Sequence, residues 1–241
     1  MTRSAPYQPL LLRILHSCSG ILAITAIITG FLVYNTFDKR FGKIPIPKIN
    51  PIQDIHGTAG LFFLLLLPAL VIYSFHIGQR RLLQADSLQQ LSQFNRPIWW
   101  VSLQRLANTL MLIASVLAVV SGRMMKEEWL PLGELNHIWY SFHLIAWLLM
   151  VFCLAIHLLM SAKVGGVPLL LSIISWKFRP EDSPKNWFSS LRSWWVNFPS
   201  NVKGEVGQVI ANNLVLGIVE VFVLVGIVAA FLLPLFFAGG E

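Results

Sequence analysis

Five long apolar runs constrain what this chain of 241 residues can fold into. They cover residues 14–34, about 55–79, 106–122, a stretch within 135–162, and about 209–238. Each run is close to the roughly 20 residues that a helix needs to cross a hydrocarbon core of about 30 Å. Because a backbone in lipid must satisfy its own hydrogen bonds, each run is predicted to be a transmembrane helix. We therefore expect an all-α integral membrane bundle, with four core helices and a fifth transmembrane helix.

The composition excludes several classes of protein. Only 12% of the residues are charged, about half the charged fraction of an average soluble domain, which excludes a soluble enzyme and a disordered protein. The formal net charge is +7, but the basic residues lie between the apolar runs, where they contact lipid head groups. We therefore expect membrane lipid, and not nucleic acid, as their partner. The 2 cysteines form no C-x-x-C-H motif and no four-cysteine cluster, which excludes covalently attached haem and iron–sulfur sites.

The distribution of basic residues predicts the orientation of the bundle. With a cytoplasmic N-terminus, the inner segments hold 12 of the 18 Lys and Arg residues and the outer segments hold 6. Because cytoplasmic loops carry an excess of basic residues, this bias predicts that the N-terminus is cytoplasmic and the C-terminus is outside. The membrane is expected to be a bacterial-type plasma membrane or an internal energy-converting membrane.

The chain is expected to divide into three parts. Residues 1–165 hold the four core helices, residues 166–208 form a cytoplasmic loop, and residues 209–241 carry the fifth transmembrane helix. Residues 186–198 of the loop are rich in Trp and Phe, which predicts a short helix in the plane of the membrane interface. A second cytoplasmic loop spans residues 80–104. Neither loop is large enough to hold a separate active site.

Six histidines lie in or at the ends of the apolar runs: His16, His56, His76, His137, His143 and His157. Ionisable groups at such positions are costly and mark functional sites. His143 and His157 are 14 residues apart, so a helix places them within about 40° of the same face and about 21 Å apart along its axis. That helix is therefore predicted to present two imidazoles at two depths in the membrane.

Two of the other histidines supply partners at the same two depths. With a cytoplasmic N-terminus, His16 and His157 both lie near the cytoplasmic surface, and His56 and His143 both lie in the outer half. Each pair comes from two helices, as bis-imidazole ligation of a planar macrocycle requires. We predict that the two pairs are the axial ligands of two iron porphyrins, held without a covalent bond. A bare zinc ion is a poorer match, because it takes about four ligands.

Four further residues each have two interpretations. Arg13 and Arg105 are candidates to bind haem propionates, since a guanidinium pairs with carboxylates in bidentate fashion, or they anchor the bundle at the cytoplasmic surface. His76 is predicted to face away from the haem side of its helix, and His137 to lie at the outer interface. Either histidine is an alternative for one of the four chosen ligands.

The histidines and the motifs around them resemble those of the membrane-bound di-haem cytochrome b subunits of respiratory formate dehydrogenases and nickel–iron hydrogenases, which are related to bacterial cytochrome b561. The matching motifs are Arg13-Ile14-Leu15-His16, Thr29-Gly30, His56-Gly57-Thr58-Ala59-Gly60, Gln104-Arg105-Leu106, Ser121-Gly122, and His143 with His157. The resemblance covers about residues 8–165. It implies two b haems that carry electrons between a redox partner on the outer side and a quinone near the inner haem.

The resemblance also implies where the quinone binds. In that family the quinone pocket lies beside the ligand that matches His157 and just before the residue that matches Gln104. Val101 and Leu103 stand where the family has polar and small residues, so the chain departs from the family at this pocket.

Three residues are candidates for a quinone or proton site: Gln104, His76 and Glu220. Glu220 is expected to act either as a proton relay to the quinone or as a structural partner of Arg105, of His76 or of a polar residue on a neighbouring helix. No flavin or nucleotide motif is present, so we expect an electron-transfer subunit of an oxidoreductase and not a complete enzyme. Two alternatives stay open: a haem-free scaffold or transporter subunit, and a self-standing quinol oxidase.

Overall fold

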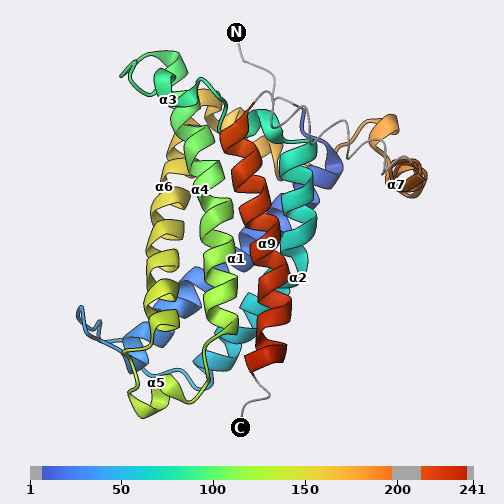
Figure 1. The fold of residues 1–241 in the computed structure, drawn as a ribbon. Helices are drawn as coiled ribbons and strands as arrows, with labels where there is room; N and C mark the ends of the chain where they lie inside the picture. The colour runs from blue at the N-terminus through green and yellow to red at the C-terminus, as the bar shows by residue number, and fades with distance from the viewer. Residues whose placement is uncertain (1–6, 197–212, 238–241) are drawn as a thin grey trace. The chain divides into compact units, whose positions relative to one another are not determined.

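The computed structural model describes residues 7–196 and 213–237, and all regular structure within these ranges is helical. Five helices are long and apolar enough to cross a membrane: α1 (Leu10–Phe37), α2 (Ile52–His76), α4 (Pro97–Arg123), α6 (Ile138–Ser172) and α9 (Leu214–Phe237) (Figure 1). They confirm the expected all-α membrane bundle. Short segments lie in the connections: η1 (Gln79–Arg81), α3 (Ser87–Gln90), α5 (Trp129–Leu132), η2 (Pro180–Asp182), η3 (Pro184–Asn186) and α7 (Trp187–Val196).

Helix α4 begins earlier than the sequence predicts. The predicted span starts at Leu106, whereas the helix starts at Pro97, inside the segment 80–104 that the sequence places in a loop. Proline is favoured in a first helical turn because an N–H at that position would have no intrahelical partner. Arg105 is accommodated within the helix because its Nε donates a hydrogen bond to the Arg80 carbonyl (3.1 Å). A charge-free run therefore underestimates the helix at this end.

Helix α6 continues past residue 162, where the predicted span ends, and stops at Ser172. At Gly166 the backbone has φ 64° and ψ −167°, so a single non-helical residue interrupts the helix. Glycine adopts a positive φ without the steric cost that a Cβ would bring. Pro168 lies in the first turn of the second segment, where proline is tolerated. Residues 166–172, expected in a loop, therefore form a short helical extension.

The chain divides into two compact units that cut across the long helices. Unit 1 comprises residues 1–17, 73–109 and 156–221. Unit 2 comprises residues 18–72, 110–155 and 222–241. Each of the five membrane-spanning helices therefore contributes one part to unit 1 and the other part to unit 2.

In unit 1, the segment that follows α6 contacts the beginning of α1. The Asp182 carboxylate accepts hydrogen bonds from the Leu10 backbone N–H and from the Tyr7 hydroxyl. The first N–H groups of a helix have no intrahelical partner, and a side-chain oxygen is their usual substitute. The Arg179 guanidinium lies over the Tyr7 ring, 4.3 Å from its centroid. These contacts fix the start of α1 against the segment around residue 180.

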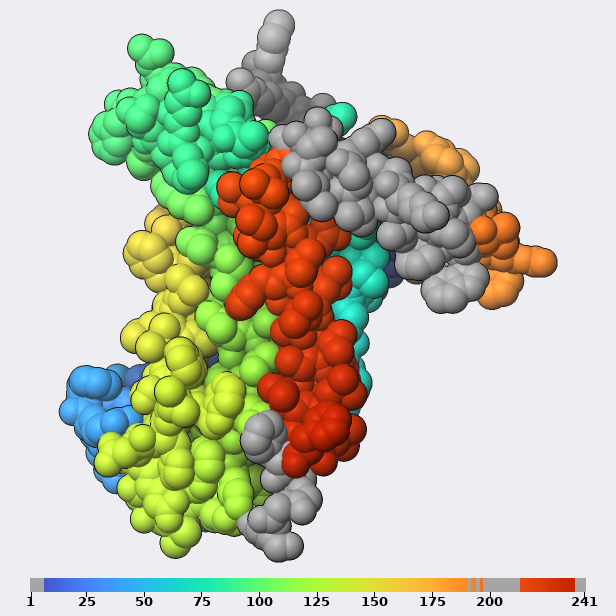
Figure 2. All heavy atoms as spheres, viewed as in Figure 1, coloured from blue at the N-terminus to red at the C-terminus, as the bar shows by residue number. Residues whose placement is uncertain are grey.

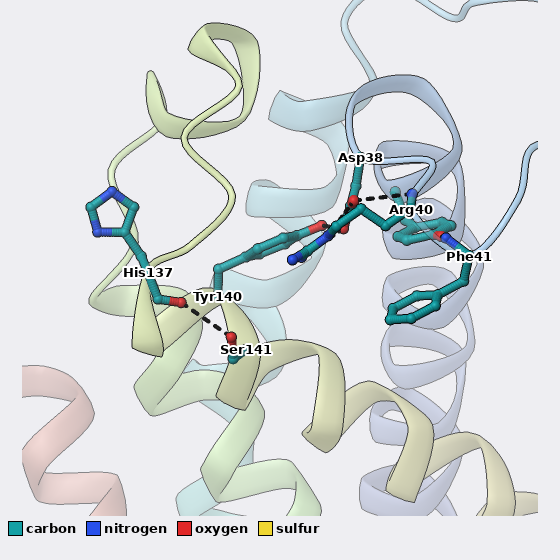
Figure 3. Close-up of polar contacts among 7 residues, drawn as sticks. Asp38, Arg40, Phe41, His137, Tyr140 and Ser141 are labelled. Atoms are coloured by element: carbon teal, nitrogen blue, oxygen red, sulfur yellow. Dashed lines mark hydrogen bonds and ion pairs between the residues drawn. The ribbon is translucent and has the colours of Figure 1, made fainter.

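In unit 2, Asp38 holds together the end of α1 and the beginning of α6 (Figure 3). Its carboxylate has no exposed surface and accepts hydrogen bonds from Arg40 Nε (2.7 Å) and from the Tyr140 hydroxyl (2.7 Å). Burial by itself raises the pKa of Asp38, but the hydrogen bonds from Arg40 and Tyr140 outweigh it, so the pKa lies below its ordinary value. The Asn35 amide fixes the following loop through two hydrogen bonds with the backbone of Ile44.

Helix α9 has one packed face and one exposed face. The buried side chains recur at helical spacing: Leu216, Val223, Ile227 and Ala230. In unit 2, a Cβ on Gly226 would lie 2.1 Å from Val116 Cγ1, so this glycine permits close packing against α4. The other face carries exposed apolar side chains such as Ile218 and Val225. Figure 2 shows α9, in red, at the surface of the molecule. That face suits contact with lipid.

Helix α7 (Trp187–Val196) lies within residues 186–198, where the sequence predicts an interfacial helix. Phe188 and Val196 are both largely exposed. Residues 197 and 198 lie outside the described residues. The position of α7 in the membrane interface stays a prediction.

Candidate functional site

In unit 2, the structure brings His56 and His143 together. His56 lies on α2 and His143 on α6, and their ring centroids are 5.8 Å apart with the ring planes at 81°. Both rings line a cavity of about 430 Å³. Its other walls include Ala26 on α1 and Ala118 on α4, so four helices surround the space between the imidazoles.

Hydrogen bonds fix the tautomer of both rings in their neutral form. His143 Nδ1 lies 3.1 Å from the Ala118 carbonyl oxygen, which can only accept, so Nδ1 carries the hydrogen. His56 Nδ1 lies 3.1 Å from Thr29 Oγ1. The single Thr29 hydroxyl hydrogen is directed to the Thr25 carbonyl (2.7 Å), so Thr29 accepts from His56. Both imidazoles therefore keep an unprotonated Nε2 with a lone pair for a metal.

Two glycines let these rings approach their neighbouring helices. A Cβ on Gly30 would lie 3.1 Å from His56 Cε1, and a Cβ on Gly122 would lie 3.2 Å from His143 Cε1. Both distances are shorter than ordinary van der Waals contact between carbons. Larger residues at either position would displace an imidazole, which gives Thr29-Gly30 and Ser121-Gly122 a physical role at the site.

In unit 1, the structure brings His16 and His157 together, with ring centroids 5.9 Å apart and ring planes at 34°. His157 Nδ1 lies 2.7 Å from Asn108 Oδ1. Asn108 Nδ2 donates to the Arg81 carbonyl (2.9 Å), which fixes the orientation of the amide and leaves its oxygen to accept from His157. The Nε2 lone pair of His157 is therefore available to a metal. Sequence reasoning missed Asn108, whose signal is its spacing of one helical turn from Gln104.

Arg13 lies in the same unit, one helical turn before His16. It is 4% exposed, and its Nη1 donates a hydrogen bond to the Ser175 carbonyl. Its Nε and Nη2 have no hydrogen-bond partner among the residues that the structure describes. A buried guanidinium with unpaired donors is costly unless an anion binds it. A haem propionate is an anion that would satisfy these donors.

The geometry of both pairs fits a haem. If two imidazole nitrogens each lie about 2 Å from a shared iron, the ring centroids are roughly 6 Å apart. The observed separations are 5.8 and 5.9 Å. Within residues 7–196 and 213–237, no group of three or more His, Cys, Asp or Glu side chains could hold a metal ion. The donor set therefore suits a metal that brings its own equatorial ligands.

The remaining candidate residues, Arg105, Gln104 and His76, contact groups other than the four paired imidazoles. Arg105 contacts the Arg80 carbonyl, as described above. Gln104 Nε2 donates to Ser161 Oγ (2.9 Å), one helical turn after His157. His76 Nε2 lies 3.1 Å from Glu220 Oε1, which is one of the structural pairings expected for Glu220.

His137 is not brought to either imidazole pair. Its ring stacks on Trp129 with centroids 3.7 Å apart, and its Nε2 lies 3.2 Å from Glu134 Oε2. These contacts account for His137 without a metal.

Facing pairs of imidazoles from different helices of an all-helical membrane bundle are an arrangement typical of membrane cytochromes. The sequence profile of the family described as prokaryotic cytochrome b561 matches residues 7–176, and the chain belongs to this family. The protein is accordingly an integral membrane protein of a b-type cytochrome family that binds haem b and transfers electrons. Comparison with curated proteins and with solved structures found no match. Helix α9 lies outside the matched residues.

Proposed function

We propose that the chain is a di-haem b-type cytochrome that transfers electrons across the membrane between a redox partner and the quinone pool. His56 and His143 would bind one haem iron, and His16 and His157 would bind the other. Residues 1–165 would then form the complete haem-binding domain. The loop 166–208 and the fifth helix in 209–241 would be additions to that domain.

The observation that carries this proposal is the hydrogen bond that each of three paired imidazoles makes through Nδ1. His56, His143 and His157 each direct Nδ1–H to a protein acceptor, which leaves the Nε2 lone pair as the one that would bind a metal. Haem-binding and other metal-binding histidines have this arrangement, because the second nitrogen is held by a hydrogen bond that orients the ring and raises its basicity. Ordinary packed histidines have no need to face one another in pairs.

The chain's own residues would do three things for electron transfer. The imidazole pairs hold the iron, and the hydroxyl, amide and carbonyl groups behind them set its potential. Arg13 neutralises a propionate inside unit 1. The apolar helices keep water away from the centres, which lowers the cost of electron transfer between them. A bound haem supplies the one-electron iron couple.

The predicted orientation assigns a different electron-transfer partner to each of the two histidine pairs. With a cytoplasmic N-terminus, His56 and His143 serve a redox partner on the outer side, and His16 and His157 serve a quinone on the cytoplasmic side. Gln104 supports this assignment, because its bond to Ser161 places a polar group one turn from His157. A quinone carbonyl is a natural acceptor for such an amide.

The decisive experiment is a dithionite-reduced minus oxidised absorbance spectrum of the detergent-purified protein, with haem counted by pyridine haemochrome. We expect two b haems per chain, and about one in His56→Ala or in His157→Ala. Folded protein without haem, made with ample haem supply, would favour a haem-free scaffold or transporter subunit. Two haems together with quinol-driven oxygen consumption by the chain alone would favour a self-standing quinol oxidase.

A further inference from the structure

Glu220 is the single charged residue of helix α9, and it lies on the packed face of that helix. It follows Leu216 by four residues and precedes Val223 by three, and both of these side chains are buried. Residues with this spacing share one face of a helix. A carboxylate in the middle of a buried apolar stripe is costly, so its partner determines what it can do.

That partner is the His76 imidazole. His76 Nε2 lies 3.1 Å from Glu220 Oε1, and the two side chains are 25% and 15% exposed. A lysine or an arginine at this position would keep a permanent positive charge and form a static ion pair. An imidazole gains and loses its proton near neutral pH. The pair is therefore neutral when it holds one proton and carries a single negative charge when that proton leaves.

A hydrogen-bonded segment connects this part of α9 with the His157 site inside unit 1. Asn213, just before α9, donates from Nδ2 to the Leu83 carbonyl (2.8 Å), and its Oδ1 accepts from the Leu216 N–H at the start of the helix. Two residues earlier in that segment, the Arg81 carbonyl accepts from Asn108 Nδ2. Asn108 is the residue that holds His157. The backbone of residues 81–83 therefore contacts both Asn108, which holds His157, and Asn213, which lies just before α9.

We propose that His76 and Glu220 form a proton-transfer pair that serves quinone chemistry in unit 1, an inference that rests on the proposed function. Oxidation of one quinol to a quinone releases two electrons and two protons. The two electrons would go to the two proposed haem irons, one to each. One proton would go to the His76–Glu220 pair, and the other proton would go to water. In the reverse direction the pair returns its proton to the quinone. The fifth helix thereby supplies the carboxylate of this pair, and the four-helix core supplies its imidazole.

The test uses the full-length chain in nanodiscs, with decylubiquinol and menadiol as reductants and stopped-flow absorbance of haem as the readout. Glu220→Gln keeps the size and hydrogen bonding of the side chain but cannot carry a proton. We expect it to slow quinol-driven haem reduction on the order of a hundred-fold. Haem content, midpoint potentials and reduction by dithionite stay at the wild-type level. Added azide, a small base that shuttles protons, restores part of the rate.

The chain offers a matched control. Glu134 and His137 form the same carboxylate–imidazole contact at 3.2 Å, but these side chains are more exposed, at 51% and 38%. Glu134→Gln is expected to leave the rate unchanged. His76→Gln removes the imidazole from the other side of the proposed pair, and it is expected to slow quinol-driven reduction as Glu220→Gln does.

Several results would overturn the inference. One is a wild-type rate of quinol-driven haem reduction in Glu220→Gln, and another is an equal slowing of that rate in Glu134→Gln. A third is loss of haem in both Glu220→Gln and His76→Gln, which would assign the pair to helix packing. Failure of the proposed function has a different signature. In that case dithionite reduces the wild-type chain but neither quinol does, and the inference falls with it.

Discussion

At the residue scale, the proposed chemistry of the site depends on the groups that accept hydrogen bonds from the imidazoles. Thr29, Ala118 and Asn108 each accept a hydrogen bond from an imidazole Nδ1. Such bonds strengthen an imidazole as a ligand and stabilise the oxidised iron. The sequence predicts the four histidines because their spacing and depth can be read along a helix. It does not predict Asn108 as their partner, because the bond depends on the rotation of α4 against α6.

Thr29→Val removes the hydroxyl that accepts from His56 and keeps the shape of the side chain. One hydrogen bond contributes about 1 kcal/mol, so the midpoint potential of one haem is expected to rise by on the order of 40 mV. A spectroelectrochemical titration measures this shift. Thr36→Val is the matched control on α1, because Thr36 Oγ1 donates its hydrogen bond to the Leu32 carbonyl of the same helix. Equal potentials in the two variants would contradict the role of Thr29.

Gly30→Val places side-chain atoms where His56 Cε1 now lies, 3.1 Å from the position of a Cβ. The imidazole must move, so the variant is expected to retain about one haem per chain when wild type holds two. The pyridine haemochrome assay counts them. Gly20→Val is the control on the same helix, since a Cβ there meets nothing within 4 Å. Full haem content in Gly30→Val would argue against iron bound at His56.

At the element scale, the five spans follow from hydropathy, but their ends do not. Helix α4 starts at Pro97 because proline suits a first turn, and Arg105 is tolerated because a carbonyl accepts its hydrogen bond. Helix α6 continues to Ser172 because Gly166 allows one non-helical residue to join two helical segments. A rule that ends a span at a charged residue cannot anticipate either case, since both depend on local backbone contacts.

The contact between the end of α1 and the beginning of α6 depends on Asp38, whose pKa is below its ordinary value of 3.8. A lowered pKa means that Asp38 stabilises the fold above pH 3.8, and that this contribution is lost as the pH falls through the folded pKa. Thermal unfolding of the wild type is therefore expected to occur at lower temperature as the pH falls below about 4. Asp38→Ala removes the partner of Arg40 and Tyr140, and should cost about 1–3 kcal/mol at neutral pH. A pH response in Asp38→Ala equal to that of the wild type would contradict this assignment.

At the scale of the whole molecule, the residues that match the family profile include all four candidate iron ligands. All four paired histidines lie within residues 7–176, and α9 lies beyond them. The sequence predicts this division because the fifth apolar run carries no histidine. It cannot predict how α9 attaches, since the contacts of Asn213, Glu220 and Gly226 join residues far apart in the chain.

A chain that ends at residue 205 is expected to keep the full haem content of the wild type. The four remaining helices supply all the proposed iron ligands, and Val116, which packs against Gly226 of α9, is an apolar side chain that lipid can cover. Haem counting and the dithionite difference spectrum measure the outcome in detergent-purified protein. Loss of haem in a truncated chain that is shown to be helical would place part of the haem site on α9.

The contact between Asp182 and the start of α1 has a consequence for the order of biosynthesis. The Leu10 N–H and its acceptor are 172 residues apart in the chain. At a translation rate of about 5–20 residues per second, roughly 10–30 s pass between the synthesis of the two. During that interval the start of α1 is without this hydrogen-bond acceptor, and for most of it His16 is without His157. A haem bound by His16 and His157, as proposed, could therefore be captured only late in synthesis, after the fourth membrane-spanning helix has been made.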